Sequence, residues 1–319
     1  MRAAFAMAPA LVPFVFGESE RARLLQLIEI DPAVTSLAAI AEPADVELLI
    51  AGWGLAPVAP GDLDPFTALR AVVHWGGGIG PLDAAAASRG IRISTARAAN
   101  AIPVAEFTQA MITLAAKDAF WASRQYCAEQ RFIDREAELP RTGLYGATVG
   151  IVGASTIGTL VAEKLAGSDV RVLLYDPYAT AETAQRLGAE LVGELAELAR
   201  RCDILSVHAP EMPATRGMIS RDVLAAMPDG ATLINTARGA LIDQDALVAE
   251  LQRGRLRAIL DVTDPEVLAP GHPLYSLPNV FLTPHLAGST GNELRRLGQA
   301  ALAEVERFVE GRPFANPAP

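Results

Sequence analysis

Short apolar runs alternate with amphipathic helical segments along most of the chain. The clearest example is 149–176, where an apolar run at 149–152 is followed by a glycine and by a helical pattern beginning at Thr156. A second apolar run, 170–175, then stops at Asp176. Continuous apolar runs of about four to eight residues are typical of strands buried on both faces of a parallel sheet. The pattern therefore predicts an α/β fold built from βαβ units.

The N-terminal part, residues 1–98, reads as a small α/β unit of its own. Its expected strands lie at 13–16, 46–51, 69–74 and 91–93, and its expected helices at 20–30 and 83–89. The second and third strands run into glycine-rich loops, 52–54 and 76–80, and in open α/β sheets ligands collect at such carboxyl ends. Four glycines within 76–80 exceed what a turn needs, so we expect the backbone there to approach a ligand closely.

The rest of the chain continues the alternation. We expect one long helix over 100–129 and an irregular arm at 130–146 before the 149–176 unit. Further strands are expected at 203–208, 232–235, 257–260 and 280–282, a helix N-capped by Asp243 runs to about residue 251, and a last helix covers 289–310.

The turn after the first run of 149–176 carries candidate chemistry. Gly153 to Gly158 partly match the G-x-G-x-x-G fingerprint of dinucleotide-binding turns, in the strand, turn, helix, strand and acid order that the fingerprint requires. The first amides of the following helix attract a pyrophosphate. Asp176 can accept hydrogen bonds from the adenosine ribose and would repel a 2′-phosphate, which favours NAD over NADP.

Ser155 replaces the second glycine of this fingerprint. Its Cβ should displace the pyrophosphate slightly, whereas its hydroxyl can donate a hydrogen bond to a phosphate oxygen. The sequence leaves open which effect is larger.

The composition mainly excludes certain classes of protein, partner and site. Hydrophobic residues make up 51% of the chain, enough for buried cores, and no apolar stretch reaches the ~18 uninterrupted residues of a membrane span. The net charge of −10 argues against a nucleic acid or an anionic membrane as partner, and we expect a cytoplasmic protein. The two cysteines and four histidines lack the spacing of disulfide frameworks or metal sites, so no metal is expected.

Six blocks of sequence carry a resemblance to a known family. They read VAEFTQAMITLAA, VGIVGASTIG, DILSVHAP, LINTARGALIDQDALVAEL, AILDVTDPE and LPNVFLTPHLAGST. In this order, over about residues 69–310, they resemble the D-isomer-specific 2-hydroxyacid dehydrogenases. The blocks around 235–251 and 284–285 are far more specific than the glycine turn.

The resemblance implies two doubly wound parallel-sheet domains. A Rossmann NAD-binding domain at 99–286 would be inserted into a flavodoxin-like substrate domain formed by 1–98 and 287–319, with the substrate in the cleft. The resemblance also implies a homodimer that is paired through the NAD domain.

The resemblance assigns roles to individual residues as well. It implies that Arg238, Glu266 and His285 are catalytic, and that the amides of Gly77 and Gly78 bind the substrate carboxylate. Arg238 and His285 are implied to contact the substrate as well. Asp261 matches the acceptor of the nicotinamide carboxamide. The positions that match cofactor contacts are Gly153, Ser155, Thr156, Ile157, Gly158, Asp176, His208, Pro210, Thr236, Ala237, Asp261 and Gly288.

The residue types suit the reduction of a small 2-keto acid with NADH. The planar guanidinium of Arg238 can hold the carboxylate through two hydrogen bonds and polarise the ketone. His285 can donate a proton near neutral pH. A carboxylate of Glu266 beside His285 would hold the ring and favour the imidazolium.

Some alternatives stay open. NADP use is disfavoured because Pro177 and Tyr178, which follow Asp176, offer no cation for a 2′-phosphate. An NADH-sensing binding protein is another possibility, since the C-terminal-binding co-repressors share this fold and keep the Arg-Glu-His set. Trp53 and Trp75 belong either to the core or to a reshaped substrate pocket, and His208 either to the core or to the cofactor site.

Overall fold

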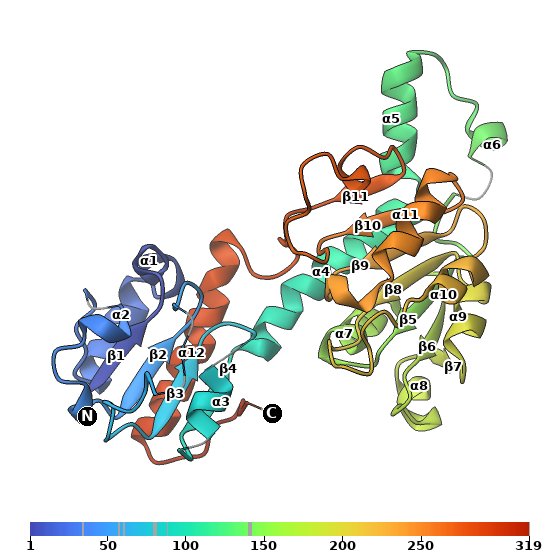
Figure 1. Ribbon diagram of the computed structural model, residues 1–319. Helices are drawn as coiled ribbons and strands as arrows, with labels where there is room; N and C mark the ends of the chain where they lie inside the picture. Colours follow the sequence, from blue (N-terminus) through green and yellow to red (C-terminus); the bar gives the residue numbers. More distant parts are fainter. Residues whose placement is uncertain are drawn as a thin grey trace. The chain divides into compact units, whose positions relative to one another are not determined.

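The computed structural model describes residues 1–33, 35–56, 58–59, 61–78, 82–87, 89–139 and 142–318 (Figure 1). The chain divides into two compact units. Unit 1 consists of Met1–Ala101 and Gly288–Pro319, and unit 2 of Ile102–Ala287. The sequence places the corresponding boundaries at 98/99 and 286/287.

Unit 1 is built on a parallel sheet with the strand order β1-β2-β3-β4. One face is covered by helices near both ends of the chain, which share a core with Phe5, Ile50 and Val73, and the other face packs against α3. The elements are β1 (Ala3–Ala6), η1 (Pro9–Leu11), α1 (Val12–Val15), α2 (Glu18–Leu27), η2 (Leu37–Ala39), η3 (Pro43–Asp45), β2 (Leu48–Ala51), β3 (Ala71–His74), α3 (Leu82–Ala87), β4 (Arg92–Thr95), η6 (Gly291–Glu293) and α12 (Leu294–Val309).

The prediction of a first strand at 13–16 is wrong. These residues lie mostly in α1, and the first strand is β1. Pro13 occupies the first turn of α1, a position that proline favours because its missing N–H is not needed there. Val15 is fully buried against α12, where a side chain at Gly298 would collide with the Val15 carbonyl. The alanines of β1, which are poor strand formers, hid the true strand.

Unit 2 is built on a parallel sheet with the strand order β11-β10-β9-β8-β5-β6-β7. The order reverses between β5 and β8, the point where ligands bind at the carboxyl ends of the strands of a doubly wound sheet. The strands are β5 (Thr148–Val152), β6 (Arg171–Tyr175), β7 (Ala189–Leu191), β8 (Ile204–Val207), β9 (Thr232–Asn235), β10 (Arg257–Leu260) and β11 (Val280–Leu282). Both faces of each sheet are covered, so the predicted fold class is confirmed.

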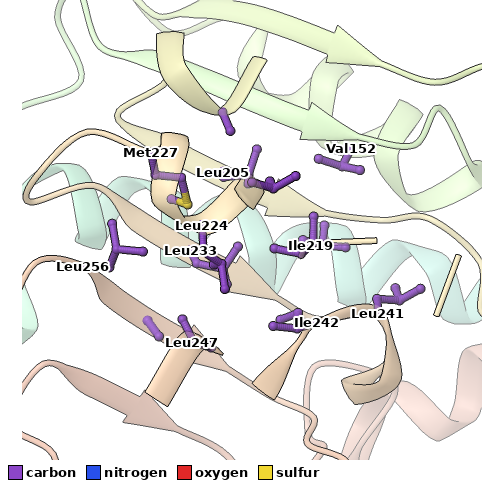
Figure 2. Packing of buried hydrophobic residues seen from close by; sticks show 14 of the residues in the cluster. Val152, Leu205, Ile219, Leu224, Met227, Leu233, Leu241, Ile242, Leu247 and Leu256 are labelled. Carbon is purple, nitrogen blue, oxygen red and sulfur yellow. The ribbon is translucent and has the colours of Figure 1, made fainter. Parts of the chain in front are cut away.

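Helices cover both faces of the unit 2 sheet. On one face Leu205 and Leu233 of the strands meet Leu224 and Leu247 of two helices, and Met227, which follows the first of these helices (Figure 2). Alternate strand residues point to the opposite face. Each fully buried side chain of this size contributes about 1.5–3 kcal/mol. The helices and 3₁₀ turns are α7 (Thr156–Leu165), α8 (Ala181–Arg186), α9 (Leu195–Arg201), α10 (Arg221–Ala226), η4 (Gly239–Leu241), α11 (Gln244–Gln252) and η5 (Pro273–Tyr275).

The helix predicted over 100–129 is two helices, α4 (Arg97–Ala116) and α5 (Ala119–Glu129). The break lies at Asp118, which has a left-handed φ of 53° and a carboxylate paired with Arg257. The short α6 (Arg135–Glu138) follows, so α5 and α6 form an arm of unit 2 (Figure 1). Within the described residues, no helix has the length and apolar character needed to cross a membrane.

Candidate active site

The turn after β5 depends on glycine at two positions. Gly153 has φ +98°, and a Cβ there would lie 2.8 Å from the backbone nitrogen of Ala209. A Cβ on Gly158 would lie 2.0 Å from the carbonyl oxygen of Gly153. The two glycines therefore allow α7 to begin directly against the strand end, with its first amides, those of Thr156 and Ile157, at the expected pyrophosphate position.

Ser155 is the N-cap of α7. Its Oγ accepts a hydrogen bond from the Gly158 amide at 3.2 Å, so the helix start is satisfied from within the chain. The hydroxyl hydrogen stays available for a phosphate oxygen, but the Gly158 amide does not. With serine in place of the second glycine, the phosphate can therefore receive a hydrogen bond from the Ser155 hydroxyl instead of from the Gly158 amide.

We expect Ser155→Gly to lower the Kd for NADH about two- to fivefold. Glycine removes the Cβ that keeps the pyrophosphate away and frees the Gly158 amide, while it weakens the cap by only a few tenths of a kcal/mol. Fluorescence titration measures Kd. Ser155→Ala is the matched control, because it removes the hydroxyl and keeps the Cβ. Weaker binding in both variants would mean that a hydroxyl–phosphate bond outweighs the steric effect.

Asp176 joins the end of β6 to the glycine turn. One carboxylate oxygen accepts the Ala154 amide at 2.7 Å, and the other accepts the Tyr178 amide at 2.8 Å. Each oxygen keeps a further lone pair, so the carboxylate can still accept hydrogen bonds from ribose hydroxyls. The turn, the start of α7 and this acid together fit a dinucleotide.

His208 lies in the interior at the end of β8. Its ring is 3% exposed, and its Nε2 lies 2.8 Å from the Ser206 hydroxyl. Burial lowers the pKa of His208 to about 3, so the ring is neutral near neutral pH. Its Nδ1 has no hydrogen-bond partner among the described residues. Pro210, two residues on, is exposed. The packing agrees with a core histidine, and a cofactor contact stays a prediction.

Arg238 follows β9 in a turn that Asn235 holds. The Asn235 side chain accepts the Ala237 amide at 3.0 Å and donates to the Arg238 carbonyl at 2.8 Å. Thr236 is buried and contacts the Thr108 hydroxyl of α4 at 2.8 Å. The exposed guanidinium of Arg238 donates to the Ala237 carbonyl, and no ion pair of the described residues involves it. Its charge is therefore available to an anion.

Glu266 and His285 lie together at the same edge of the sheet. The His285 Nδ1 is 2.5 Å from a Glu266 carboxylate oxygen, and the side chains are 47% and 58% exposed. Glu266 follows β10 and His285 follows β11, while Arg238 follows the next strand, β9. The Arg238 turn also approaches the segment leading to Glu266, because a Cβ on Gly239 would lie 2.1 Å from the Thr263 carbonyl carbon.

Asp261 is buried at the end of β10 and accepts hydrogen bonds from the segment that carries His285. Gly288 belongs to unit 1, where a Cβ on it would lie 3.4 Å from the Asn100 amide group. Metal-ligating side chains do not form groups of three or more within the described part of the chain.

In unit 1 the glycine loop follows β3. The Gly76 amide donates to His74 Nδ1 at 3.1 Å, and burial lowers the pKa of His74, which keeps the ring a neutral acceptor. Gly77 lies beside Asn100, whose Nδ2 would be 3.3 Å from a Cβ there. A Cβ on Gly78 would meet open space. Ile79 and Gly80, which complete the predicted loop, lie outside the described residues.

The two tryptophans of unit 1 differ. Trp75 is fully buried, and its indole nitrogen lies 3.3 Å from the Met7 sulfur, so it belongs to the core. Trp53 is 36% exposed and packs edge-on against Trp75, with ring centroids 5.0 Å apart. Of the two, only Trp53 offers a surface to a ligand.

Sequence reasoning missed the residues that hold the site in place. Asn100 accepts the Ser289 amide at 2.9 Å, which directs its Nδ2 toward the glycine loop. Asn235 shapes the Arg238 turn. In the sequence, the only sign of Asn100 and Asn235 is that each places a polar side chain where an apolar residue would have continued the helical or strand pattern.

Comparisons with known proteins find related sequences and similar structures. Residues 109–287 match the family model described as D-isomer specific 2-hydroxyacid dehydrogenase, NAD binding domain. The chain is 31% identical over 295 residues to the D-3-phosphoglycerate dehydrogenase of Methanocaldococcus jannaschii, covering 91% of this chain and 55% of that protein. It is 34% identical over 254 residues to the glyoxylate reductase of Aeropyrum pernix, covering 78% and 76%.

A solved structure is also similar. The apo form of D-mandelate dehydrogenase from Rhodotorula graminis superposes with a TM-score of 0.82 at 28% identity, covering 100% of this chain and 97% of that chain. The chain spans about half the length of the D-3-phosphoglycerate dehydrogenases that it matches.

Proposed function

This chain belongs to the D-isomer specific 2-hydroxyacid dehydrogenase family, and on that premise we propose that it reduces a small 2-keto acid with NADH or catalyses the reverse oxidation. The predicted family and the predicted cofactor, NAD, are confirmed. Bound NADH supplies the hydride. The observation that carries the proposal is the Glu266–His285 pair, with 2.5 Å between the carboxylate oxygen and the ring nitrogen.

The chain's own residues supply the remaining chemistry. Arg238 binds the substrate carboxylate and polarises the ketone, since its charge is exposed and makes no ion pair among the described residues. His285 donates the proton that the new alkoxide needs, and Glu266 orients its ring. In unit 1 the amides of Gly77 and Gly78 are further candidates for binding the carboxylate.

The test is turnover. NADH absorbance is followed with a panel of 2-keto acids that carry small, branched, aromatic and phosphorylated side chains. Steady NADH consumption with at least one of them supports the proposal. Tight NADH binding without turnover of any 2-keto acid or D-2-hydroxy acid would favour the NADH-sensing binding protein, which the family relationships do not favour.

Glu266→Gln should lower kcat for reduction about 10-fold, because the amide keeps the shape of the side chain but replaces the charge-assisted hydrogen bond that orients the His285 ring by a weaker neutral one. The Kd for NADH should stay within about twofold of wild type, since the glycine turn and Asp176 are untouched. A kcat equal to that of wild type would remove Glu266 from the mechanism.

Asp176→Asn should raise the ratio of kcat/KM for NADPH over NADH about 10- to 100-fold, ~1.4–2.7 kcal/mol. Asparagine removes the charge that would repel a 2′-phosphate. Its carbonyl can still accept the Ala154 amide, while its Nδ2 then faces the Tyr178 amide, so that one hydrogen bond is lost. Asp176→Ala, which also releases the turn, should give the same shift with weaker binding of both cofactors. A wild-type preference for NADPH would contradict the assignment.

We also propose a homodimer paired through unit 2. The support is the arm formed by α5 and α6, where Tyr126 is 60% exposed and Phe132, between the two helices, is 79% exposed. Light scattering tests this, and a monomer at micromolar concentration would exclude it. A cytoplasmic location stays a prediction that cell fractionation can test.

A further inference from the structure

The turn that carries His285 is built around one buried side chain, that of Asp261. The Thr283 amide donates a hydrogen bond to the Leu260 carbonyl at 2.9 Å. The Thr283 hydroxyl donates to Asp261 Oδ1 at 2.5 Å. The His285 amide donates to the Asp261 carbonyl at 2.9 Å. The Leu286 amide donates to Oδ1 at 2.8 Å and the Ala287 amide to Oδ2 at 2.9 Å.

The backbone amides of residues 285, 286 and 287 therefore all donate hydrogen bonds to Asp261. Pro284 has no backbone N–H and so needs no acceptor. Asp261 is 2% exposed, and within the described residues its carboxylate is compensated by one hydroxyl and two amides rather than by a cation. Because so many hydrogen-bond donors of the turn bind Asp261, this residue fixes the conformation of the turn.

The backbone conformation at His285 depends on these hydrogen bonds to Asp261. Its φ is +54°, in the left-handed region that non-glycine residues rarely occupy and that persists only where the surroundings determine it. That conformation sends the ring toward the Glu266 carboxylate. We propose that Asp261 and Thr283 form a positioning clamp that holds His285 against Glu266; the functional part of this inference rests on the role of His285 proposed above.

The clamp differs from the role that the family resemblance suggests for Asp261, an acceptor for the nicotinamide carboxamide. A carboxylate offers about four lone-pair sites. Three are already taken by donors from 283–287, so most of its capacity is used within the chain. The two roles make opposite predictions, because loss of the clamp affects His285 and loss of a carboxamide acceptor affects cofactor affinity.

Asp261→Asn is the sharpest substitution, because it keeps the volume of the side chain. In one amide orientation Nδ2 faces the Ala287 amide, and in the other it faces the Leu286 amide. Either orientation sets a donor against a donor, so the turn must open. Thr283→Val removes a single contact at equal volume, and Thr283→Ser restores the hydroxyl. If Asp261→Asn does not fold, the Thr283→Val and Thr283→Ser variants test the proposal instead.

The first measurement is amide hydrogen exchange followed by mass spectrometry, with no substrate or cofactor. In Asp261→Asn we expect peptides covering 283–290 to exchange about 10-fold faster or more, while β8 and β9 keep wild-type protection. Thr283→Val should show a smaller increase, and Thr283→Ser should match wild type. Unchanged exchange at 285–287 in Asp261→Asn would overturn the clamp, whatever the activity of the protein.

The second measurement separates the clamp from a cofactor contact. We expect kcat for reduction to fall about 100-fold in Asp261→Asn, as small misplacements of a catalytic group do, with the Kd for NADH within about twofold of wild type. The kcat of Thr283→Val should fall in the same direction, and Thr283→Ser should recover it. A Kd for NADH raised 10-fold or more with kcat unchanged would overturn the inference in favour of the carboxamide role. Normal kcat in His285→Ala would instead refute the proposed function and leave the exchange result standing.

Discussion

His285→Ala is expected to lower kcat for ketone reduction about 10²–10⁴-fold, the usual contribution of general acid catalysis. The ring is 47% exposed, so substrate can reach it, and its Nδ1 is engaged with Glu266 at 2.5 Å. The other ring nitrogen is then the one that can donate a proton. The Kd for NADH should stay within about twofold of wild type, because the substitution leaves the glycine turn and Asp176 untouched.

The left-handed backbone at His285 calls for a second variant. Alanine is strained at a φ of +54°, so part of its effect could come from a disturbed turn. Asparagine tolerates this conformation and cannot act as a general acid, so His285→Asn should lose the same activity with the turn intact. His272→Asn is the matched control, since the His272 side chain caps η5 by accepting the Leu274 amide and lies outside the proposed site. Near-normal turnover in His285→Asn would exclude the histidine as the acid.

The sequence predicts the strands of unit 2 except β7, because strands buried on both faces are continuous apolar runs, whereas β7 is a partly exposed edge strand. The predicted β9 matches the structure, and Asp243 caps α11 as expected, accepting the Ala246 amide at 2.9 Å. The proximity of Glu266 and His285 follows from motif positions on neighbouring strands. These features depend on local pattern, which one sequence displays.

The features that the sequence did not predict depend on contacts between residues distant in the chain. Asp118 breaks the long helix while pairing with Arg257, and Asn100 fixes the chain at Ser289. The clamp of Asp261 and Thr283 joins residues on two strand ends. None of these pairs has a periodic signature, because each residue alone is compatible with an ordinary loop or helix. The order of strands brings them together, and that order is a property of the fold.

Arg238→Ala is expected to lower kcat/KM for the 2-keto acid about 10²–10³-fold, as loss of a single preorganised donor at a developing oxyanion does. Both KM and kcat should change, because the guanidinium binds the carboxylate in the ground state and polarises the ketone in the transition state. The turn that presents it should survive, since Asn235 bonds to the backbone of Ala237 and Arg238 and not to the guanidinium.

Arg238→Lys separates charge from geometry. Lysine keeps the positive charge but cannot form the planar pair of hydrogen bonds, so its kcat/KM should fall between those of wild type and Arg238→Ala. Arg253→Ala is the matched control, because the Arg253 side chain is 71% exposed and, among the described residues, its ion pair is with Glu250. It should leave the kinetics unchanged. If Arg238→Ala keeps kcat/KM within about threefold of wild type, the substrate carboxylate binds elsewhere, and the amides of Gly77 and Gly78 become the first candidates.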